Sequence, residues 1–480
     1  MKPDSLKRLA AASCWDDAVV GNHTPVHLLD GAVVPFVGLD CASTAPALRH
    51  VVHTVEELLP QYGSVGRGGG RKSELCTLAY EEARRRIMRF VGADSDRHVG
   101  VFVKQTTDAI NQLASQLPLT GGDVVLCTLA EHHANMLPWM RAAKRSGAEF
   151  ILVGVEPSSG EILVDSMLEQ IERYKGRVKL VAMSGASNVT GHIPDWRHIA
   201  KAVHAQGGAL LIDGAQLAPH RSVDVRDPRD DECIDFFALS GHKMYAPFGS
   251  GLLVASRRLL ESCEPAQVGG GAAAWVELER VLWRDLPYRN EAGSPNLIGA
   301  VAMAAATDAL STVGMDRIRN HEIDLTRYTL RRLREVEGLA ILGPADDRCE
   351  NRLGVFTFTI PGIDHKLVSA ILNYEHGIAT RSGAFCAHPY VVELMRSQGE
   401  AGRSNAHPGA VRASLGLYSV REDIDRLVDG LKAIAAGQYA DTYAADERAD
   451  AYAPTDWEYE LSDALPPQWI RRNAKRELLV

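Results

Sequence analysis

Between residues 99 and 255, short apolar runs alternate with segments of helical periodicity. The apolar runs lack polar alternation, which is typical of strands buried on both faces of a parallel sheet. This order predicts an α/β fold: a large domain whose mostly parallel, seven-stranded sheet is covered by helices on both faces. The predicted strands are residues 99–103, 124–128, 149–153, 178–183, 209–212, 236–239 and 251–255. The predicted helices between them are residues 108–115, 136–146, 166–174 and 196–206.

The pattern changes after residue 298, where helical periodicity dominates. We expect a smaller α+β domain over residues 299–436, packed against the large domain of residues 37–298, with a ligand site in the crevice between them. Its predicted helices are residues 298–310, 315–336, 366–374 and 423–435, and its short strands are residues 355–360 and 378–381. Earlier in the chain we predict a short strand over 37–40, helices over 48–59 and 75–91, and a mobile glycine-rich loop over 62–72 that covers a site.

Composition narrows the class of protein. The 480-residue chain carries a formal net charge of −9, which argues against nucleic acid as a main partner. No apolar run reaches the roughly 18 residues of a membrane span, and the N-terminus lacks the apolar core of a signal peptide, so cytoplasm is the expected compartment. The eight cysteines are scattered without a CxxC pair, which argues against a disulfide scaffold and against a structural metal site.

Residues 437–480 form a charged, aromatic-containing extension. It begins acidic and tyrosine-rich and ends basic, so it could fold back on the body or bind a partner. The composition predicts disorder for much of it, while Trp457, Tyr459 and Trp469 indicate that part of it docks.

One lysine follows an apolar run. The segment from Ile234 to Leu239 ends at Ser240-Gly241-His242-Lys243, which places the amine of Lys243 where a strand end opens into a loop. Poor solvation there lowers the pKa of a lysine, and a neutral amine can react with an aldehyde. We therefore predict that Lys243 carries pyridoxal 5'-phosphate (PLP). A surface lysine after a strand is the plain alternative.

Polar residues also follow other predicted strands, at the edge where parallel sheets bind ligands. Thr106 and Thr107 stand at a helix start, where they could bind a phosphate or simply cap the helix. His132 and His133 lack the third ligand and the HxxxH spacing of a metal site, and an imidazole stacked on a flat ring is the other use. Asp213 directly follows a buried strand, where a protonated pyridine nitrogen would pair with it.

Thr107, His132, Asp213 and Lys243 thus occur in chain order at successive strand ends, a grouping that chance explains poorly. The motifs LDCAS, KQTTDAIN, EHHANMLPW, SNVTG, LLIDGAQ, SGHKMYAPFGSG, EAGSPN, RSGAFCAHP and VRASLG resemble those of fold-type I PLP enzymes of the class V aminotransferase family. The nearest resemblance is to cysteine desulfurases and selenocysteine lyases of the Suf type, over about residues 37–430. It implies the PLP transferase fold type I, a homodimer with its sites at the interface, and an N-terminal segment, residues 1–36, that joins the small domain.

The resemblance implies how the cofactor is held. Lys243 would carry PLP and later move the Cα proton of the substrate. Asp213 would pair with the pyridine nitrogen, Gln216 would contact the phenolic oxygen, and His132 would stack on the ring. Ser294, where the family usually has Thr, would contact the phosphate in the partner subunit. The other expected cofactor-binding residues are Thr106, Thr107, Asn188, Ser240 and His242, of which Thr107, Ser240 and His242 would hold the phosphate.

The resemblance also implies a reaction. Arg412 would pair bidentately with the substrate carboxylate, with Arg381 and Asn188 as further substrate-binding residues. Cys386, five positions after Arg381, matches the nucleophile that takes sulfur from L-cysteine as a persulfide and leaves L-alanine. Arg381 and His388 could favour its thiolate. The expected function is that of a PLP-dependent cysteine desulfurase with Lys243, Cys386 and His132 as catalytic residues.

Three departures from the Suf pattern leave an alternative open. Gly66 stands where these enzymes usually have His, Phe385 stands where they often have His, and residues 396–408 form a longer polar segment that could be a lid or an acceptor surface. In the alternative, Cys386 is structural and the chain performs another class V reaction, such as C–S lysis, elimination or transamination. A scaffold within a sulfur-transfer assembly is a third hypothesis, which the complete cofactor-binding set disfavours.

The expected partner is a small amino-acid substrate, with cysteine favoured. A sulfur-acceptor protein could be a second partner.

Overall fold

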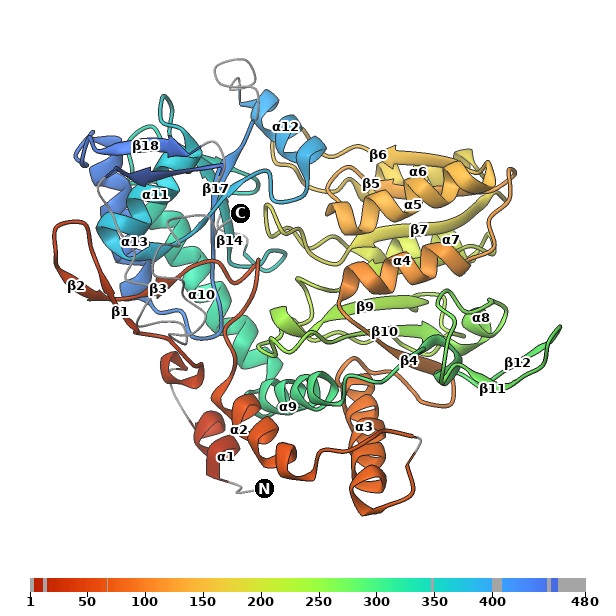
Figure 1. The fold of residues 1–480 in the computed structure, drawn as a ribbon. Coiled ribbons are helices and arrows are strands. Elements are labelled where there is room, and N and C mark those ends of the chain that lie inside the picture. The colour runs from red at the N-terminus through yellow and green to blue at the C-terminus, as the bar shows by residue number, and fades with distance from the viewer. Residues whose placement is uncertain are drawn as a thin grey trace.

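The computed structural model describes residues 4–11, 15–66, 68–346, 349–398, 408–446 and 450–455. Its larger part is built on one seven-stranded sheet, and a smaller part with its own sheet lies beside it (Figure 1). The strands of the large sheet are β4 (His98–Val103), β5 (Val124–Thr128), β6 (Glu149–Val153), β7 (Val178–Ser184), β8 (Ala209–Asp213), β9 (Phe236–Ser240) and β10 (Gly251–Ser256). Each predicted strand is confirmed to within one residue at either end.

The strand order of this sheet is β4-β10-β9-β8-β7-β5-β6. β10 runs antiparallel to both of its neighbours, and the remaining neighbours are parallel. The predicted mostly parallel sheet is therefore confirmed. The strand order brings the ends of β8 and β9 side by side, and these are the ends that Asp213 and Ser240 occupy.

Helices cover both faces of the sheet. Successive strand residues point to opposite faces, and in β5 Val125 belongs to one apolar cluster while Leu126 belongs to the other. The cluster that contains Val125 also contains side chains of α4 (Thr106–Gln116) and α5 (His133–Ser146). The cluster that contains Leu126, on the opposite face, includes side chains of α2 (Arg49–Leu58), α3 (Arg71–Phe90), α6 (Val164–Arg173), α7 (Trp196–His204) and α9 (Leu297–Val313). Near β10 lies the short helix α8 (Arg257–Glu261).

The smaller part has a four-stranded sheet of order β13-β14-β17-β16. Its strands are β13 (Ala340–Leu342), β14 (Val355–Thr359), β16 (Arg381–Gly383) and β17 (Ala410–Ser414), and its helices are α10 (Met315–Leu333), α11 (His365–His376), α12 (His388–Ser397) and α13 (Arg421–Ala435). β13, β17 and α12 did not emerge from the apolar pattern.

The N-terminal segment contacts both parts of the molecule. It contains α1 (Asp4–Ala11), whose Leu6 and Leu9 pack in the apolar cluster of the large part near α9. It also contains the hairpin of β1 (Pro25–His27) and β2 (Val33–Pro35), which lies against the smaller part. β3 (Val37–Gly38) pairs in parallel with β15 (Ile378–Ala379), and the amide of Leu29 donates to the carbonyl of Tyr374. The contact of Leu29 agrees with the prediction that this segment joins the smaller domain, whereas the packing of α1 on α9 ties its first residues to the large one.

Two further hairpins, like that of β1 and β2, lie outside the predicted elements. One consists of β11 (Ala273–Val276) and β12 (Val281–Trp283) and projects from the large sheet (Figure 1). The other consists of β18 (Tyr443–Asp446) and β19 (Ala451–Pro454), and Ala453 packs on Ala370 and Tyr374 of α11. The prediction of disorder after residue 437 is therefore wrong for this hairpin, because its small and aromatic side chains cover an apolar patch of α11. Trp457, Tyr459 and Trp469 lie outside the described residues.

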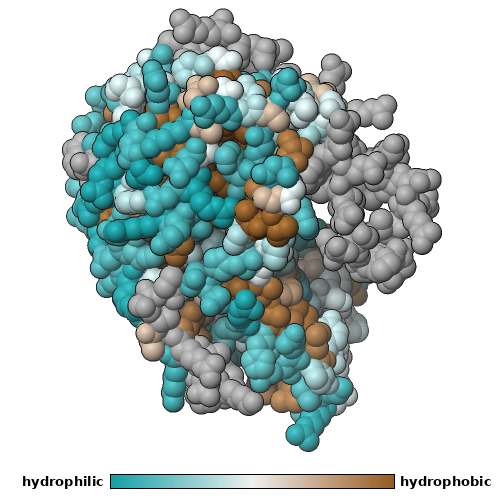
Figure 2. All heavy atoms as spheres, turned by 90° about the vertical axis from the view of Figure 1, so that its left-hand side faces the viewer, coloured by the Kyte–Doolittle hydropathy of each residue, from teal (hydrophilic) through white to brown (hydrophobic). Residues whose placement is uncertain are grey.

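Four short 3-10 helices complete the described elements: η1 (Asp16–Ala18), η2 (Leu59–Gln61), η3 (Gly241–Lys243) and η4 (Tyr288–Asn290). The face of the molecule that carries the smaller part is mainly hydrophilic, with separate hydrophobic patches (Figure 2). Among the described residues, no single helix is long and apolar enough to cross a membrane. Of the helices in the described ranges, only α9 and α10 taken together, across a bend of 76°, pass the test of length and hydropathy.

Candidate active site

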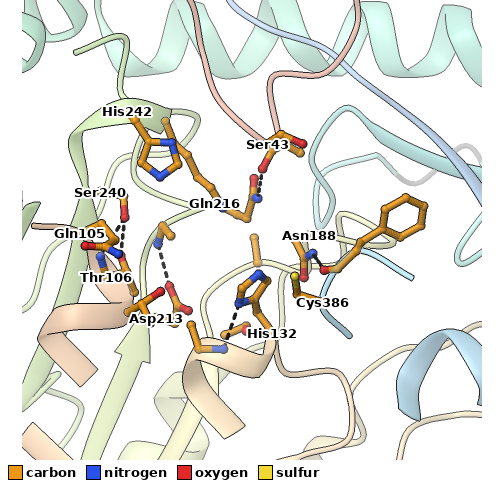
Figure 3. A pocket seen from close by; sticks show the side chains of 18 of the residues that line it. Ser43, Gln105, Thr106, His132, Asn188, Asp213, Gln216, Ser240, His242 and Cys386 are labelled. Carbon is orange, nitrogen blue, oxygen red and sulfur yellow. Dashed lines mark hydrogen bonds between the residues drawn. The ribbon is translucent and has the colours of Figure 1, made fainter. Parts of the chain in front are cut away.

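A cavity of about 320 Å³ opens between the carboxyl ends of the large sheet and the smaller part (Figure 3). This is the edge at which parallel sheets bind ligands. Of the predicted site residues, the structure brings twelve together around the cavity: Thr106, Thr107, His132, Asn188, Asp213, Gln216, Ser240, His242, Lys243, Arg381, Cys386 and Arg412. Ser294 is the exception, since it is exposed and does not line the cavity of its own chain.

Lys243 ends η3, the turn that directly follows β9. Burial lowers the pKa of its amine to about 8, while the charges of Asp213 and Cys386 act in the opposite direction and that of Arg412 acts in the same direction. About one amine in ten is therefore neutral at pH 7, against fewer than about one in a thousand for an ordinary lysine. The neutral form is the one that nucleophilic chemistry at a lysine requires.

Asp213 is the last residue of β8 and is buried. The amide of Ala215 donates to its Oδ1 at 3.0 Å. Burial raises the pKa of Asp213, and the amide of Ala215 and the charge of Lys243 oppose that rise. A cationic group placed at this carboxyl would therefore be stabilised by it.

His132 is the N-cap of α5, and its Nδ1 accepts from the amide of Ala134 at 3.0 Å. Its other ring nitrogen therefore carries the proton of the neutral tautomer. Burial lowers the pKa of His132 to about 4, and the charge of Lys243 lowers it further. A neutral, oriented imidazole thus faces the cavity (Figure 3), which suits stacking on a flat ring.

Hydroxyl groups gather at the N-terminus of α4. The Oγ of Ser240 accepts from the amide of Thr106 at 2.9 Å and donates to the Oγ1 of Thr106 at 2.9 Å. Thr107 and His242 line the same end of the cavity, and burial lowers the pKa of His242 to about 4. The dipole of a helix start favours an anion and the hydroxyl groups can donate to one, so this end of the cavity can hold a phosphate.

Arg412 lies in the middle of β17 and is buried. Its Nη2 contacts Oδ1 of Asp40 at 3.1 Å and Oγ of Ser43 at 2.8 Å, and its Nη1 donates to the carbonyl of Asn188 at 2.9 Å. Its Nε is buried without a hydrogen-bond partner among the described residues. Arg381 lies opposite Arg412 on β16 and also lines the cavity. The two guanidinium groups make this side of the cavity a carboxylate site.

Cys386 lies on the loop between β16 and α12, at the mouth of the cavity. Of the seven cysteines in the described chain, all of them free thiols, it is the exposed one. Its charge acts on the pKa of Lys243 and of Arg412, after the larger effect of burial in each case. The thiol is therefore within electrostatic reach of both the amine and the carboxylate site.

Sequence reasoning missed several residues that shape the cavity. Asp40 and Ser43 hold Arg412, and their signal in the sequence was the motif LDCAS, which contains both but gave neither a role. Glu131 is buried and accepts from Thr128, Asn135 and Ser184. Burial raises its pKa to about 7, against the effect of these hydrogen bonds. It ties β5, α5 and β7 together directly behind His132.

The glycine-rich loop lies elsewhere than expected. Gly66 lines a separate cavity of about 210 Å³, together with Arg284 and Glu291. The described residues of the loop do not line the main cavity of their own chain, so the prediction that the loop covers this site is wrong for a single chain. Most of the lengthened segment, residues 399–407, lies outside the described residues.

Comparison with known proteins identifies the family and the fold. The sequence pattern described as aminotransferase class-V matches residues 37–427. The chain belongs to the class-V aminotransferase family. Enzymes of this family depend on PLP, and the protein is a PLP-dependent enzyme of the cysteine desulfurase group.

The individual relatives support this grouping. A probable cysteine desulfurase of Halalkalibacterium halodurans is 36% identical over 402 residues, which cover 83% of this chain and 93% of that protein. A cysteine desulfurase of Haloferax volcanii is 35% identical over 408 residues, or 84% and 90% of the two chains. The solved structure of a cysteine desulfurase from Thermococcus onnurineus superimposes with a TM-score of 0.75 at 30% identity, covering 84% and 95% of the chains. The structure of the cysteine desulfurase CsdA from Escherichia coli gives a TM-score of 0.73 at 29% identity, covering 84% and 96%.

The residues of this class-V family member fit PLP on their own geometry. The buried carboxyl of Asp213 suits a cationic ring nitrogen, and the hydroxyls at α4 suit a phosphate. The neutral imidazole of His132 and the half-buried amine of Lys243 face the space between them. The unpartnered Nε of Arg412 suits the carboxylate of an amino-acid substrate. The cavity thus has a place for each part of the cofactor and of its substrate.

Proposed function

We propose that this protein converts L-cysteine to L-alanine and keeps the sulfur as a persulfide on Cys386. The observation that carries the proposal is the position of Cys386: an exposed thiol at the mouth of the cavity, within electrostatic reach of Lys243 and Arg412. A structural cysteine would be expected in the core, as the other described cysteines are.

The proposed roles follow from the site. Arg412, with Arg381, binds the substrate carboxylate and so orients the amino acid. Lys243 carries PLP and, when released, moves the Cα proton, for which a pKa near 8 is suitable. Bound PLP supplies an electron sink for the charge that develops at the substrate, and Asp213 stabilises its ring nitrogen as a cation.

The sulfur-transfer step balances without an outside oxidant. The thiolate of Cys386 forms an S–S bond to the substrate sulfur as the substrate C–S bond breaks. The electron pair of that bond stays on Cβ, which takes up a proton and becomes the methyl group of alanine. The enzyme is left with a persulfide on Cys386, which a sulfur-acceptor protein would then take over.

The test is to supply purified holoenzyme with L-cysteine and to measure alanine, pyruvate and sulfide. We expect alanine from the parent enzyme and from the control Cys263→Ala, and none from Cys386→Ala, which should keep the cofactor absorbance. If Cys386→Ala still turns over cysteine and releases pyruvate with sulfide, the protein is a C–S lyase of the same family. A panel of other amino acids tests transamination in the same assay.

We further propose a homodimer with Ser294 of each subunit at the other subunit's cofactor phosphate. This is supported by the exposure of Ser294 outside its own cavity, and by exposed apolar side chains on β11 and β12. Trp275, Val276 and Leu282 are among them, on a hairpin far from the hydrophilic face of Figure 2. Sedimentation should give twice the 52.2 kDa of the chain; a monomer that holds PLP normally would contradict the proposal.

The cytoplasm is the compartment we propose. The described cysteines are all free thiols, and Cys386 is exposed, a state that a reducing environment maintains. Cell fractionation followed by thiol labelling tests this, and recovery of the protein with an oxidised, exported fraction would contradict it.

A further inference from the structure

The loop that presents Cys386 has an unfavourable backbone conformation. Phe385 and Cys386 have φ angles of 53° and 54°, in the left-handed region that side chains with a Cβ seldom adopt. Two such residues in succession stay there only when surrounding contacts fix them. The contacts that fix this loop therefore decide where the thiol lies.

Three contacts hold the two strained residues. Nδ2 of Asn188 donates to the carbonyl of Phe385 at 2.8 Å, and the amide of His133 donates to the carbonyl of Cys386 at 2.7 Å. The ring of Phe385 lies with its centroid 4.9 Å from the guanidinium of Arg412. The main-chain contact from His133 is the one made to the cysteine itself.

The ring of His133 makes a second contact just beyond the cysteine. Its Nε2 lies 3.3 Å from the amide of His388 and 3.3 Å from Nδ1 of the same residue, and the two rings lie 4.8 Å apart. His388 is the first residue of α12, whose N-cap, Ala387, has no side chain that could cap the helix. The ring of His133 therefore supplies the cap from a different element, and it can accept from the amide only when Nε2 is unprotonated.

We propose that His133 is a positioning residue that clamps the cysteine loop from both sides of Cys386, and that protonation of its ring opens this clamp. The inference rests on the proposed role of Cys386 as the sulfur acceptor. With the clamp closed, the thiol is held at the cavity mouth. With the clamp open, the strained loop relaxes and the thiol leaves that position.

The surroundings of His133 favour the closed state near neutral pH. Burial lowers the pKa of His133, and the neighbouring imidazole of His388 on α12 lowers it further. His132, on the other side along the chain, is kept neutral by its own burial. A proton on His133 would turn Nε2 into a donor and place a positive charge at the N-terminus of α12, where the helix dipole disfavours it. Protonation and capping thus exclude each other.

Two variants separate the clamp from a purely structural role. His133→Gln keeps an acceptor of similar reach but cannot titrate, and His133→Phe keeps the bulk but removes the acceptor. Both keep the main-chain amide that bonds Cys386. The measurement is the alkylation rate of Cys386 in holoenzyme by iodoacetamide, followed on its own peptide by mass spectrometry from about pH 5 to about pH 8.

The expected result is a change in the ratio of rates between the parent and His133→Gln. At each pH the rate of the parent is divided by the rate of His133→Gln, which removes the effect of thiol ionisation that both share. A ratio that does not change with pH means that there is no clamp. We expect the ratio to be near one at pH 8 and to rise about fivefold toward pH 5, as the loss of one hydrogen bond predicts. His133→Phe should be alkylated about fivefold faster than the parent at pH 8. It should also form alanine with a lower kcat and an unchanged KM for cysteine, and His133→Gln should have the kcat of the parent.

A flat ratio, or alkylation of a well-folded His133→Phe at the parental rate, would overturn the proposal. Should His133→Phe fold poorly, as judged by cofactor absorbance and melting temperature, the pH dependence of the Gln ratio decides alone. The alkylation assay needs no turnover. If Cys386→Ala still forms alanine, the proposed function fails while the clamp is still tested.

Discussion

Arg412, which lines the cavity, forms an ion pair with Asp40, with Nη2 of the arginine 3.1 Å from Oδ1 of the aspartate. Ser43 closes the group, since its hydroxyl accepts from Arg412 at 2.8 Å and donates to Asp40 at 2.7 Å. The arginine proposed to bind the substrate carboxylate is therefore fixed in place, and part of its charge is already balanced.

Asp40→Asn should strengthen substrate binding. Asparagine keeps an oxygen for Arg412 and Ser43 but removes the competing negative charge, so we expect the KM for cysteine to fall about threefold with kcat little changed. Steady-state alanine formation over a range of cysteine concentrations measures this, with Asp441→Asn at an exposed site as the control. A rise in KM would mean that the charge of Asp40 is needed to hold Arg412.

How far the sequence predicts this site depends on the kind of signal. Asp213, Ser240 and Lys243 were found because each follows an apolar strand, and parallel strands place their carboxyl ends at one edge. Asp40 was not found in this way, because no periodicity in the sequence reveals that residue 40 lies against residue 412. That contact comes from packing between the two parts of the chain.

The same distinction applies to the fold. The seven strands of the large sheet were predicted because apolar runs report burial directly. β17 was missed, since its sequence AVRAS contains a buried arginine and small residues that do not resemble a core strand. The β11–β12 hairpin was also missed. Its apolar residues are exposed in the single chain, so burial within that chain does not explain why they form strands. The strained conformation of Phe385 and Cys386 has no signal in the sequence, because it results from contacts made by Asn188 and His133.

The uptake of PLP by the apoprotein should depend on pH through Lys243. Burial lowers the pKa of this amine to about 8 from its usual 10.5, and the neutral form is the one that reacts. We expect the rate of formation of the covalent adduct to rise about tenfold per pH unit below pH 8 and to level off above it. Stopped-flow absorbance measures the rate.

The control for this experiment is Lys243→Ala, which should bind PLP without a covalent link, as borohydride reduction and mass measurement would reveal. A rate that continues to rise to pH 10 would show that the amine titrates like an ordinary lysine.

Glu322 of α10 should be important for stability. It is buried, accepts from Nδ1 of His220 at 3.0 Å and from the amide of Gly354 at 2.9 Å, and pairs with Arg221. Burial alone would raise its pKa, but the charges of His220 and Arg221 outweigh this and hold it at about 2. Glu322→Ala leaves the buried guanidinium of Arg221 without its carboxylate partner, so we expect a loss of about 3–5 kcal/mol at neutral pH.

The pH dependence of this loss has a definite sign. The pKa of Glu322 is lower in the folded protein than its ordinary 4.5, so its stabilisation is complete above pH 4.5 and disappears as the pH falls toward 2. Melting temperatures of the parent and Glu322→Ala should therefore converge in acid, while the exposed control Glu337→Ala should match the parent throughout. A difference that stays constant with pH would argue that packing, and not charge, is lost.

His204 of α7 should stabilise the fold with the opposite pH dependence. Its Nε2 lies 2.7 Å from Oδ2 of the buried Asp235, and its Nδ1 lies 2.8 Å from the carbonyl of Asp231. Burial lowers the pKa of His204, but the hydrogen bond to Asp235 outweighs this, with help from Cys233, and raises it to about 10. Both ring nitrogens of His204 donate, so the imidazole is charged. It forms a structural ion pair with the carboxylate of Asp235.

Since the folded pKa of His204 lies above its ordinary 6.5, the stabilisation is complete below pH 6.5 and is lost as the pH rises toward 10. His204→Gln should cost about 2 kcal/mol near pH 6, and its melting temperature should approach that of the parent near pH 10. His198→Gln is the matched control on the same helix, since the pair of His198 and Asp195 is largely exposed and should contribute little. A His204→Gln variant whose deficit grows with pH would mean that this imidazole is neutral in the folded protein, and that Asp235 is held by its other donor, the amide of Leu210.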